Sequence, residues 1–219
     1  MKKYISVALF LLGFFFCSEA QTKYAYGVYY SPGLTSRITR ANGDLNWLKS
    51  ESDKLEKPEF GYAFGVFIDR EINKSWSARA GIGYSVFSEK IDSLNYLGID
   101  KYINEYRFLE VPIVATRFFG KSASNRPYFS FGYSLNYFLN KQTTYSLVGS
   151  NREELTVNKG DENQVNHAFR ISFGYDFVLD KKWNFRAELY STQFITSLTQ
   201  DDLKRYPNSL GLSIQVRKK

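Results

Sequence analysis

Large apolar side chains and small or polar ones alternate along residues 129–139. One phase holds Phe129, Phe131, Tyr133, Leu135, Tyr137 and Leu139, and the other stays small or polar until Phe138. Because successive side chains of a β-strand point to opposite faces, this period of two predicts a strand with one apolar face. That face is rich in aromatic rings rather than β-branched residues, which suits a face turned toward lipid.

The same alternation predicts further strands at 24–31, 60–69, 76–86, 109–116, 169–177, 185–190 and 209–217. The spacers also alternate: 32–59, 88–105, 141–166 and 197–206 are long or polar, whereas 70–75, 120–126 and 179–182 are short turns. Single-chain bacterial barrels have an even number of strands, short periplasmic turns and longer external loops. We therefore expect an all-β protein, an eight-stranded antiparallel up-and-down transmembrane β-barrel.

Residues 1–20 have the pattern of a secretory signal peptide. Two lysines precede an apolar run that ends at Phe16, and small residues follow at Ser18 and Ala20. We expect cleavage between Ala20 and Gln21, which leaves residues 21–219 as the barrel domain and removes the single cysteine of the chain. The expected location is the bacterial outer membrane.

The inner phase of the predicted strands carries charge. Six residues stand out: Arg79, Glu110, Arg170, Asp176, Arg186 and Glu188. An Arg or Lys facing lipid at mid-membrane costs about 2–4 kcal/mol, so these side chains must point inward. Eight strands enclose a space just wide enough for side chains. We interpret the six as a structural ion-pair core that fills the lumen; a gated or proton-conducting core is the functional alternative.

The formal net charge of +7 does not by itself indicate nucleic-acid binding. The basic residues are spread over strands and turns rather than gathered in one patch. The partners we expect are outer-membrane lipid and an extracellular or envelope protein that binds loops 32–59 and 141–166, because loops on a rigid scaffold usually carry specificity. The expected oligomeric state is a monomer.

The fourth predicted strand contains the run Leu109-Glu110-Val111-Pro112. In this run the chain resembles the small outer-membrane β-barrel family of Bacteroidetes often called PorT-like, in which a Leu-Glu-(Val/Ile)-Pro strand recurs. The resemblance implies the small barrel fold and leaves the biochemical role open; one branch of that family is associated with protein secretion and gliding. Pro112 has no N–H for a sheet ladder, so we expect a bend or bulge there.

The sequence offers little catalytic chemistry. Its single histidine, His167, has no serine at a spacing that identifies a catalytic triad, and paired histidine or cysteine metal motifs are absent from the sequence. We therefore expect no catalytic, cofactor-binding or metal-binding residue, and a non-enzymatic barrel that binds through its loops or serves the envelope or a secretion assembly. Two alternatives stay open: an outer-membrane lipid-modifying enzyme that uses His167, and a soluble lipocalin-like barrel whose aromatic faces line a ligand cavity.

Overall fold

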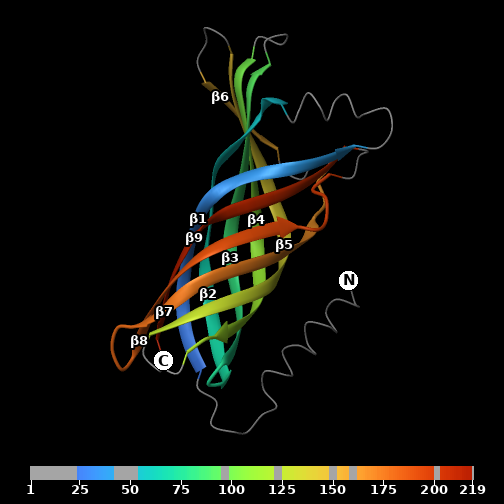
Figure 1. Cartoon of the computed structure of the whole chain (residues 1–219). Coiled ribbons are helices and arrows are strands. Elements are labelled where there is room, and N and C mark those ends of the chain that lie inside the picture. The colour runs from blue at the N-terminus through green and yellow to red at the C-terminus, as the bar shows by residue number, and fades with distance from the viewer. Residues whose placement is uncertain are drawn as a thin grey trace.

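The computed structural model describes residues 24–41, 54–94, 99–120, 125–147, 152–157, 162–199 and 203–218. The predicted signal peptide, residues 1–20, lies outside the described residues. Figure 1 shows a tall, strongly tilted β-structure with one short strand set beyond it. In the described parts of the chain, no helix is long and apolar enough to cross a membrane.

Nine strands are described, and eight of them form the barrel. Their bounds are β1 (Tyr24–Ala41), β2 (Glu56–Asn73), β3 (Trp76–Leu94), β4 (Ile99–Phe118), β5 (Asn125–Leu147), β6 (Arg152–Val157), β7 (Val165–Val178), β8 (Trp183–Phe194) and β9 (Leu203–Lys218). Each strand pairs antiparallel with its neighbours, from β4 through β3, β2, β1, β9, β8 and β7 to β5. A further β4–β5 ladder returns the order to its start. The prediction of eight antiparallel up-and-down strands is confirmed.

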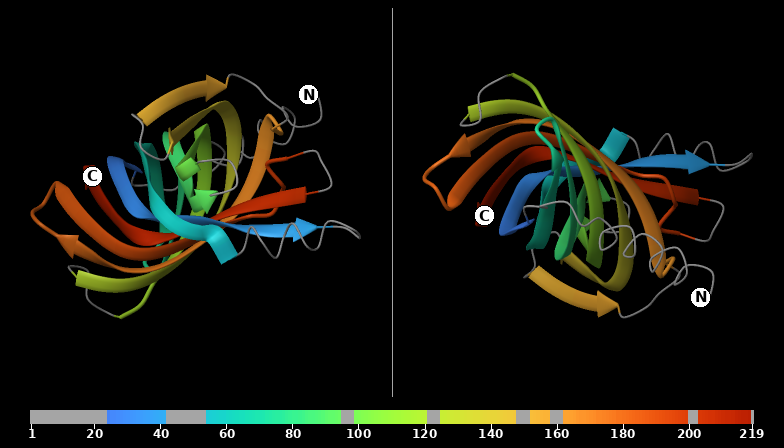
Figure 2. Two further views of the ribbon diagram at one scale, coloured as in Figure 1. Left: turned by 90° about the horizontal axis from the view of Figure 1, so that it is seen from above. Right: turned by 90° about the horizontal axis from the view of Figure 1, so that it is seen from below.

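The predicted loops 32–59 and 141–166 are wrong in their bounds. Strand β1 continues to Ala41 and β2 already begins at Glu56. In the second region β5 runs on to Leu147 and β6 pairs with that extension, as the views from above and below also show by setting β6 apart from the other strands (Figure 2). The polar residues of these spacers predict loops, but a strand that continues beyond the membrane needs no apolar face and therefore lacks the alternation that marks the other strands.

All five prolines lie inside strands, and Pro32 and Pro112 lie well away from the strand ends. Pro32 pairs with Tyr62 of β2, but the ladder between β1 and β9 skips it. Pro112 pairs with Ser134 of β5, while the ladder between β3 and β4 skips it and keeps the same register on either side. The missing proline donor is therefore accommodated by a gap in one ladder. Of the bend or bulge expected at Pro112, the bulge is wrong, because the register does not shift there.

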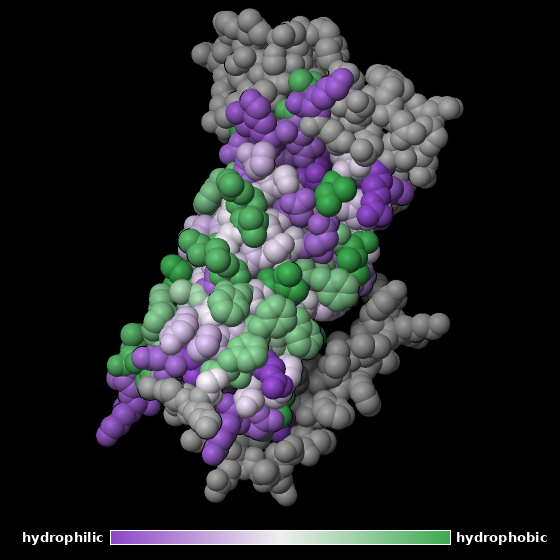
Figure 3. Space-filling view, viewed as in Figure 1, coloured by the Kyte–Doolittle hydropathy of each residue, from purple (hydrophilic) through white to green (hydrophobic). Residues whose placement is uncertain are grey.

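The aromatic faces point away from the barrel. Phe131, Phe169 and Phe173 are 51%, 53% and 59% exposed, whereas the inner phase is buried. Apolar side chains form a band across the visible face of the barrel, with polar residues gathered toward both ends (Figure 3). An exposed apolar band of this kind is the feature that lipid covers in membrane barrels. The alternative in which the aromatic faces line an internal ligand cavity is wrong.

Short turns close the end where β1 begins and β9 ends (Figure 1). In the β2–β3 turn the Asn73 side-chain oxygen accepts hydrogen bonds from the N–H groups of Ser75 and Trp76, at 2.8 and 2.9 Å. In the β7–β8 turn the Asp180 carboxylate accepts from the N–H groups of Lys182 and Trp183, which holds the pKa of Asp180 below its usual value. In a tight turn some backbone N–H groups have no backbone acceptor, and these side-chain oxygens accept their hydrogen bonds instead.

Glycine at position 211 is required by a close approach between strands. Gly211 of β9 lies opposite Gly33 of β1, and a Cβ atom at residue 211 would collide with the Pro32 carbonyl oxygen and lie 2.6 Å from the Gly33 Cα. Backbone atoms cannot move aside without shifting the ladder. We expect Gly211→Ala to lower the free energy of unfolding by about 1–3 kcal/mol, measured by urea titration of the folded barrel in detergent.

Gly132→Ala is the matched control, because its nearest obstacle is a side-chain methyl, Cγ2 of Val114, at 2.8 Å. A rotation of that side chain relieves the closest contact, and the nearest backbone atom, the Ile113 carbonyl oxygen, is 3.1 Å away rather than in collision. Equal losses of stability for the two variants would contradict the argument from backbone approach.

Candidate functional site

The lumen is the candidate site, and at the short-turn end it holds a cluster of four buried charges. Arg186 of β8 contacts Asp69 of β2 at 2.8 Å and Asp176 of β7 at 3.2 Å. Arg217 of β9 contacts the same two carboxylates, at 3.0 and 2.9 Å. Two arginines and two aspartates thus join four strands across the interior, and each buried charge has an opposite charge beside it, as desolvated ions require.

The sequence pattern selected Arg186 and Asp176 but neither Arg217 nor Asp69, which end the predicted strands 209–217 and 60–69. Both missed residues stand in the inner phase of their strands, so the alternation contained the signal. Each is the last residue of its predicted strand, where the pattern does not show how far the strand continues, whereas the structure extends β2 to Asn73 and β9 to Lys218.

A second cluster lies around Glu188 of β8. Its carboxylate accepts hydrogen bonds from Arg170 at 2.9 Å, from Tyr128 at 2.9 Å, and from Ser172 at 3.0 Å. The Gln215 amide donates to the same carboxylate at 2.9 Å. The Arg170 guanidinium also lies over the Tyr190 ring, 4.0 Å from its centroid. Glu188 is thereby saturated with donors and fixed in place.

Arg79 and Glu110 are buried but lie outside the ion pairs. Among the described side chains no acid lies within 4.0 Å of Arg79 and no base within 4.0 Å of Glu110. The Arg79 guanidinium instead lies over the Phe67 ring, at 4.5 Å. Glu110 and Arg170 line two small cavities of about 20 and 30 Å³. A cavity of that size holds about one water molecule.

Beyond the charged region a cluster of aromatic rings crosses the lumen, and we call it the aromatic plug: Phe87, Phe108, Phe138 and Phe194. The ring centroids of Phe87 and Phe194 lie 4.8 Å apart, and those of Phe108 and Phe138 lie 5.8 Å apart. Four strands contribute one ring each. The sequence signalled this cluster only through Phe138, which broke the small-and-polar inner phase of its strand.

A polar layer covers the plug on the side away from the short turns. Arg37 contacts Glu56 at 2.7 Å and Glu89 at 2.9 Å. Glu89 also accepts from the Asn104 amide at 2.6 Å and from the Tyr106 hydroxyl at 3.0 Å. The described lumen is therefore filled at successive levels by charge, by aromatic rings and by a second polar network.

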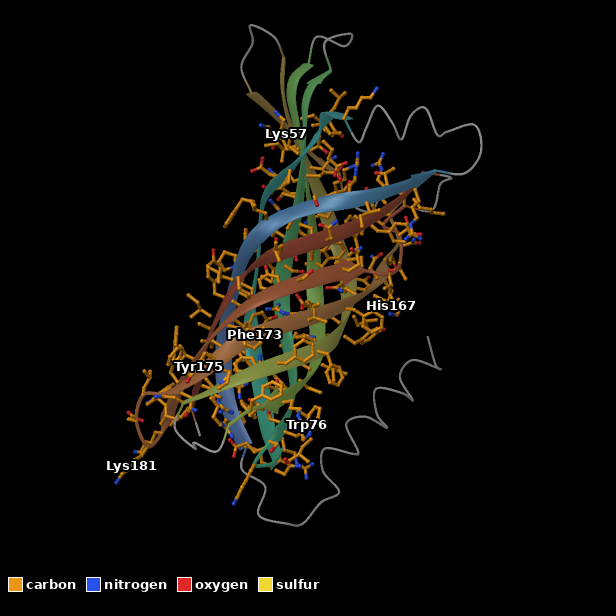
Figure 4. The ribbon with its side chains drawn as sticks, viewed as in Figure 1. Lys57, Trp76, His167, Phe173, Tyr175 and Lys181 are labelled. Carbon is orange, nitrogen blue, oxygen red and sulfur yellow. The ribbon has the colours of Figure 1, made fainter. Side chains whose placement is uncertain are left out.

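His167 does not point into this lumen. It shares the outward phase of β7 with Val165 and Phe169, and its Nδ1 is hydrogen-bonded to the Tyr133 hydroxyl. Figure 4 places it on the flank of the barrel, between the end marked by Lys57 and the end marked by Trp76 and Lys181. Within the described ranges, no group of three His, Cys, Asp or Glu side chains could hold a metal ion.

Comparison with known proteins identifies the type of barrel. A family model described as outer membrane protein beta-barrel domain matches residues 8–217. The chain is similar in structure to Neisserial surface protein A, at 12% identity and a TM-score of 0.45, over 91% of this chain and 99% of that one. It is also similar to the outer membrane protein OprG from Pseudomonas aeruginosa, at 12% identity and a TM-score of 0.44, over 87% of this chain and 95% of that one. The similarity to the outer membrane enzyme PagL has 12% identity and a TM-score of 0.46, over 86% of this chain and 97% of that one. No curated protein matches the sequence.

The buried charge cluster predicts a large stability effect at Arg186, whose side chain is fully buried. Replacing Arg186 with methionine keeps much of the volume but leaves Asp69 and Asp176 with less compensation. Removing one partner of a buried ion pair typically costs about 3–5 kcal/mol, so we expect Arg186→Met to lower the free energy of unfolding by that amount in a urea titration.

Arg107→Met is the control. Arg107 pairs with Glu105 at 3.0 Å, but the two side chains are 28% and 38% exposed. Exposed pairs contribute at most about 1 kcal/mol. If both variants lost the same stability, burial of the charge cluster would not be the cause.

Proposed function

The chain belongs to the outer membrane protein β-barrel domain family, and we propose that it is a non-enzymatic outer-membrane anchor that binds a partner outside the cell. In this proposal the barrel holds the chain in the membrane, and the strands that continue past it present the binding surface. The partner is an extracellular or envelope protein, which includes a component of a secretion assembly of the kind associated with PorT-like barrels.

One observation supports the proposal most: the lumen is filled while several strands continue beyond the filling. Strand β4 begins at Ile99, well before its plug residue Phe108, and β5 runs past Phe138 to Leu147. The extension of β5 then pairs with β6. These strands project at the end opposite the short turns (Figure 1). Ordered backbone that spans no membrane is available for recognition.

Transport through the barrel has less support. The aromatic plug and the two polar networks occupy the described lumen, and the cavities between them measure only about 20 and 30 Å³. An interior of eight strands has no space for an aqueous channel beside such side chains. A filled barrel serves as an anchor rather than as a passage.

The lipid-modifying alternative depends on His167. Hydrolytic catalysis by a histidine needs a nucleophile within hydrogen-bond reach and a group that orients the imidazole. Here the Nδ1 partner is the phenol of Tyr133, and the two rings pack at 5.7 Å between centroids. Tyr133 also packs against Phe169, at 6.0 Å. An aromatic and polar pair on an outward face suits a membrane-interface belt.

The binding proposal is tested by removing the projecting hairpin. Thr143 and Leu155 are paired residues of β5 and β6, so an Asn-Gly turn can replace residues 144–154 without changing the register. We expect both the full chain and this variant to reach the outer membrane and to migrate differently on gels before and after boiling. Crosslinking of intact cells with an impermeant amine reagent should give a protein adduct with the full chain and none with the variant.

Lys181→Ala is the control, because Lys181 lies in the β7–β8 turn at the opposite end, and its adducts should equal those of the full chain (Figure 4). Identical adducts for the full chain and the shortened variant would contradict binding by the hairpin. A protein that fractionates without detergent would contradict the anchor itself.

The enzyme alternative has its own test. Expression of the protein should leave the mass spectrum of lipid A unchanged, and His167→Ala should behave like the parent, with Tyr133→Phe as the control that removes the same hydrogen bond. Altered lipid A that returns to normal in His167→Ala but persists in Tyr133→Phe would replace the anchor proposal with a catalytic one.

A further inference from the structure

The outer surface of the barrel carries a large apolar groove near the short-turn end. Its volume is about 770 Å³, and it lies over β1, β2, β3 and β9, with Trp183 of β8 at its edge. A convex barrel does not form such a hollow unless small side chains lie between taller ones. Ala80 of β3, which pairs with Ile68 of β2, forms the low point of the groove, because its outward side chain is a single methyl group.

The groove consists of two rows of outward side chains that cross neighbouring strands. The row nearer the chain ends runs from Trp183 through Lys218, Tyr26 and Ile68 to Ala80. The next row, one step toward the middle of the barrel, is aliphatic throughout: Val216, Val28, Val66 and Ile82. Val28 and Val66 are 55% and 53% exposed. Polarity thus falls along the groove, from a cation and aromatic rings to pure hydrocarbon.

The polar end of the groove is positively charged. The Lys218 ammonium lies 6.0 Å from the centroid of the Trp183 ring, and the adjoining turn carries Lys181 and Lys182. Among the described residues, two carboxylates of the adjoining segments are engaged elsewhere: Asp180 accepts hydrogen bonds from the turn backbone, and Glu71 lies 3.9 Å from the Arg217 guanidinium. A ligand with an anionic head and an apolar tail matches both ends of this surface.

We propose that the groove binds one anionic phospholipid of the periplasmic leaflet, with its phosphate at Lys218 and an acyl chain along the aliphatic row. The inference rests on the proposed membrane location. Cations at the headgroup level attract anionic lipids, and the aromatic rings of Trp183 and Tyr26 suit the same interface. Because Ala80 leaves a hollow for the acyl chain where the barrel wall would otherwise be convex, this lipid is bound more tightly than the other lipids around the barrel.

The test is native mass spectrometry of the whole protein extracted in mild detergent, titrated with dioleoylphosphatidylglycerol and with dioleoylphosphatidylcholine. The two lipids have the same acyl chains and differ in headgroup charge. One basic residue near a membrane surface is worth about a fivefold change in affinity, so we expect the first bound phosphatidylglycerol to be favoured by about that factor. Lys218→Gln should remove the preference, and Ala80→Phe should weaken both lipids by filling the groove.

Matched controls separate this site from general lipid contact. Arg117 lies over the Trp76 ring at 5.2 Å, at the same end but outside the groove, so Arg117→Gln should keep the preference. Ala115 is an outward alanine of β4 outside the groove, and Ala115→Phe should keep both affinities. Every variant is first checked for the gel shift on boiling, which reports the closed barrel.

Four results would overturn the inference. Equal affinities for the two lipids would remove the headgroup site, and an unchanged affinity in Ala80→Phe would remove the acyl-chain groove. A dimer that Ala80→Phe dissociates would make the groove a contact between two copies of the chain. Loss of lipid preference in a protein that still fractionates with the outer membrane leaves the anchor proposal intact. A protein that is soluble without detergent would contradict both the anchor proposal and the lipid site.

Discussion

The ladder between β4 and β5 is the interaction on which the rest of the structure depends. Inside a lipid bilayer no water is available to bond with backbone N–H and C=O groups, so a sheet that spans it must have no free edge. The pairing of β4 with β5 joins the two ends of the strand order and removes that edge. Pro32 and Pro112 fit into this arrangement because one of the two ladders beside each proline skips it.

Closure fixes the size of the interior, and the size fixes its chemistry. A ring of eight strands leaves space for side chains, and whatever enters must pack or pair. Near the short turns Arg186 and Arg217 share Asp69 and Asp176, and farther along the rings of the aromatic plug meet edge to face. These layers exclude a continuous water column through the described lumen. The surfaces on which our two proposals depend therefore lie at the end and on the outer wall of the barrel, not inside it.

The outer wall is not uniform, and its variation reflects the two environments of a membrane. Aliphatic and aromatic side chains form the middle band, whereas cations and aromatic rings pair near the short turns, as Lys218 does with Trp183 and Arg117 with Trp76. Such pairs place the charge at the level of the lipid headgroups and the aromatic ring at the level where the acyl chains begin. The groove over β1, β2 and β3 adds shape to this pattern of charge.

The period-two alternation alone determined the fold class, the number of barrel strands and which face of each strand points outward, because a β-strand turns every second side chain to the same side. It placed Arg186 and Asp176 in the interior for the same reason. The pattern could not give the strand ends, because polar residues such as those of β6 continue a ladder without any apolar face to mark it. Which acid meets which arginine was also decided only by the tertiary structure. Asp69 and Arg186 are distant in sequence and meet because the closed ring brings β2 and β8 to face each other across a narrow lumen.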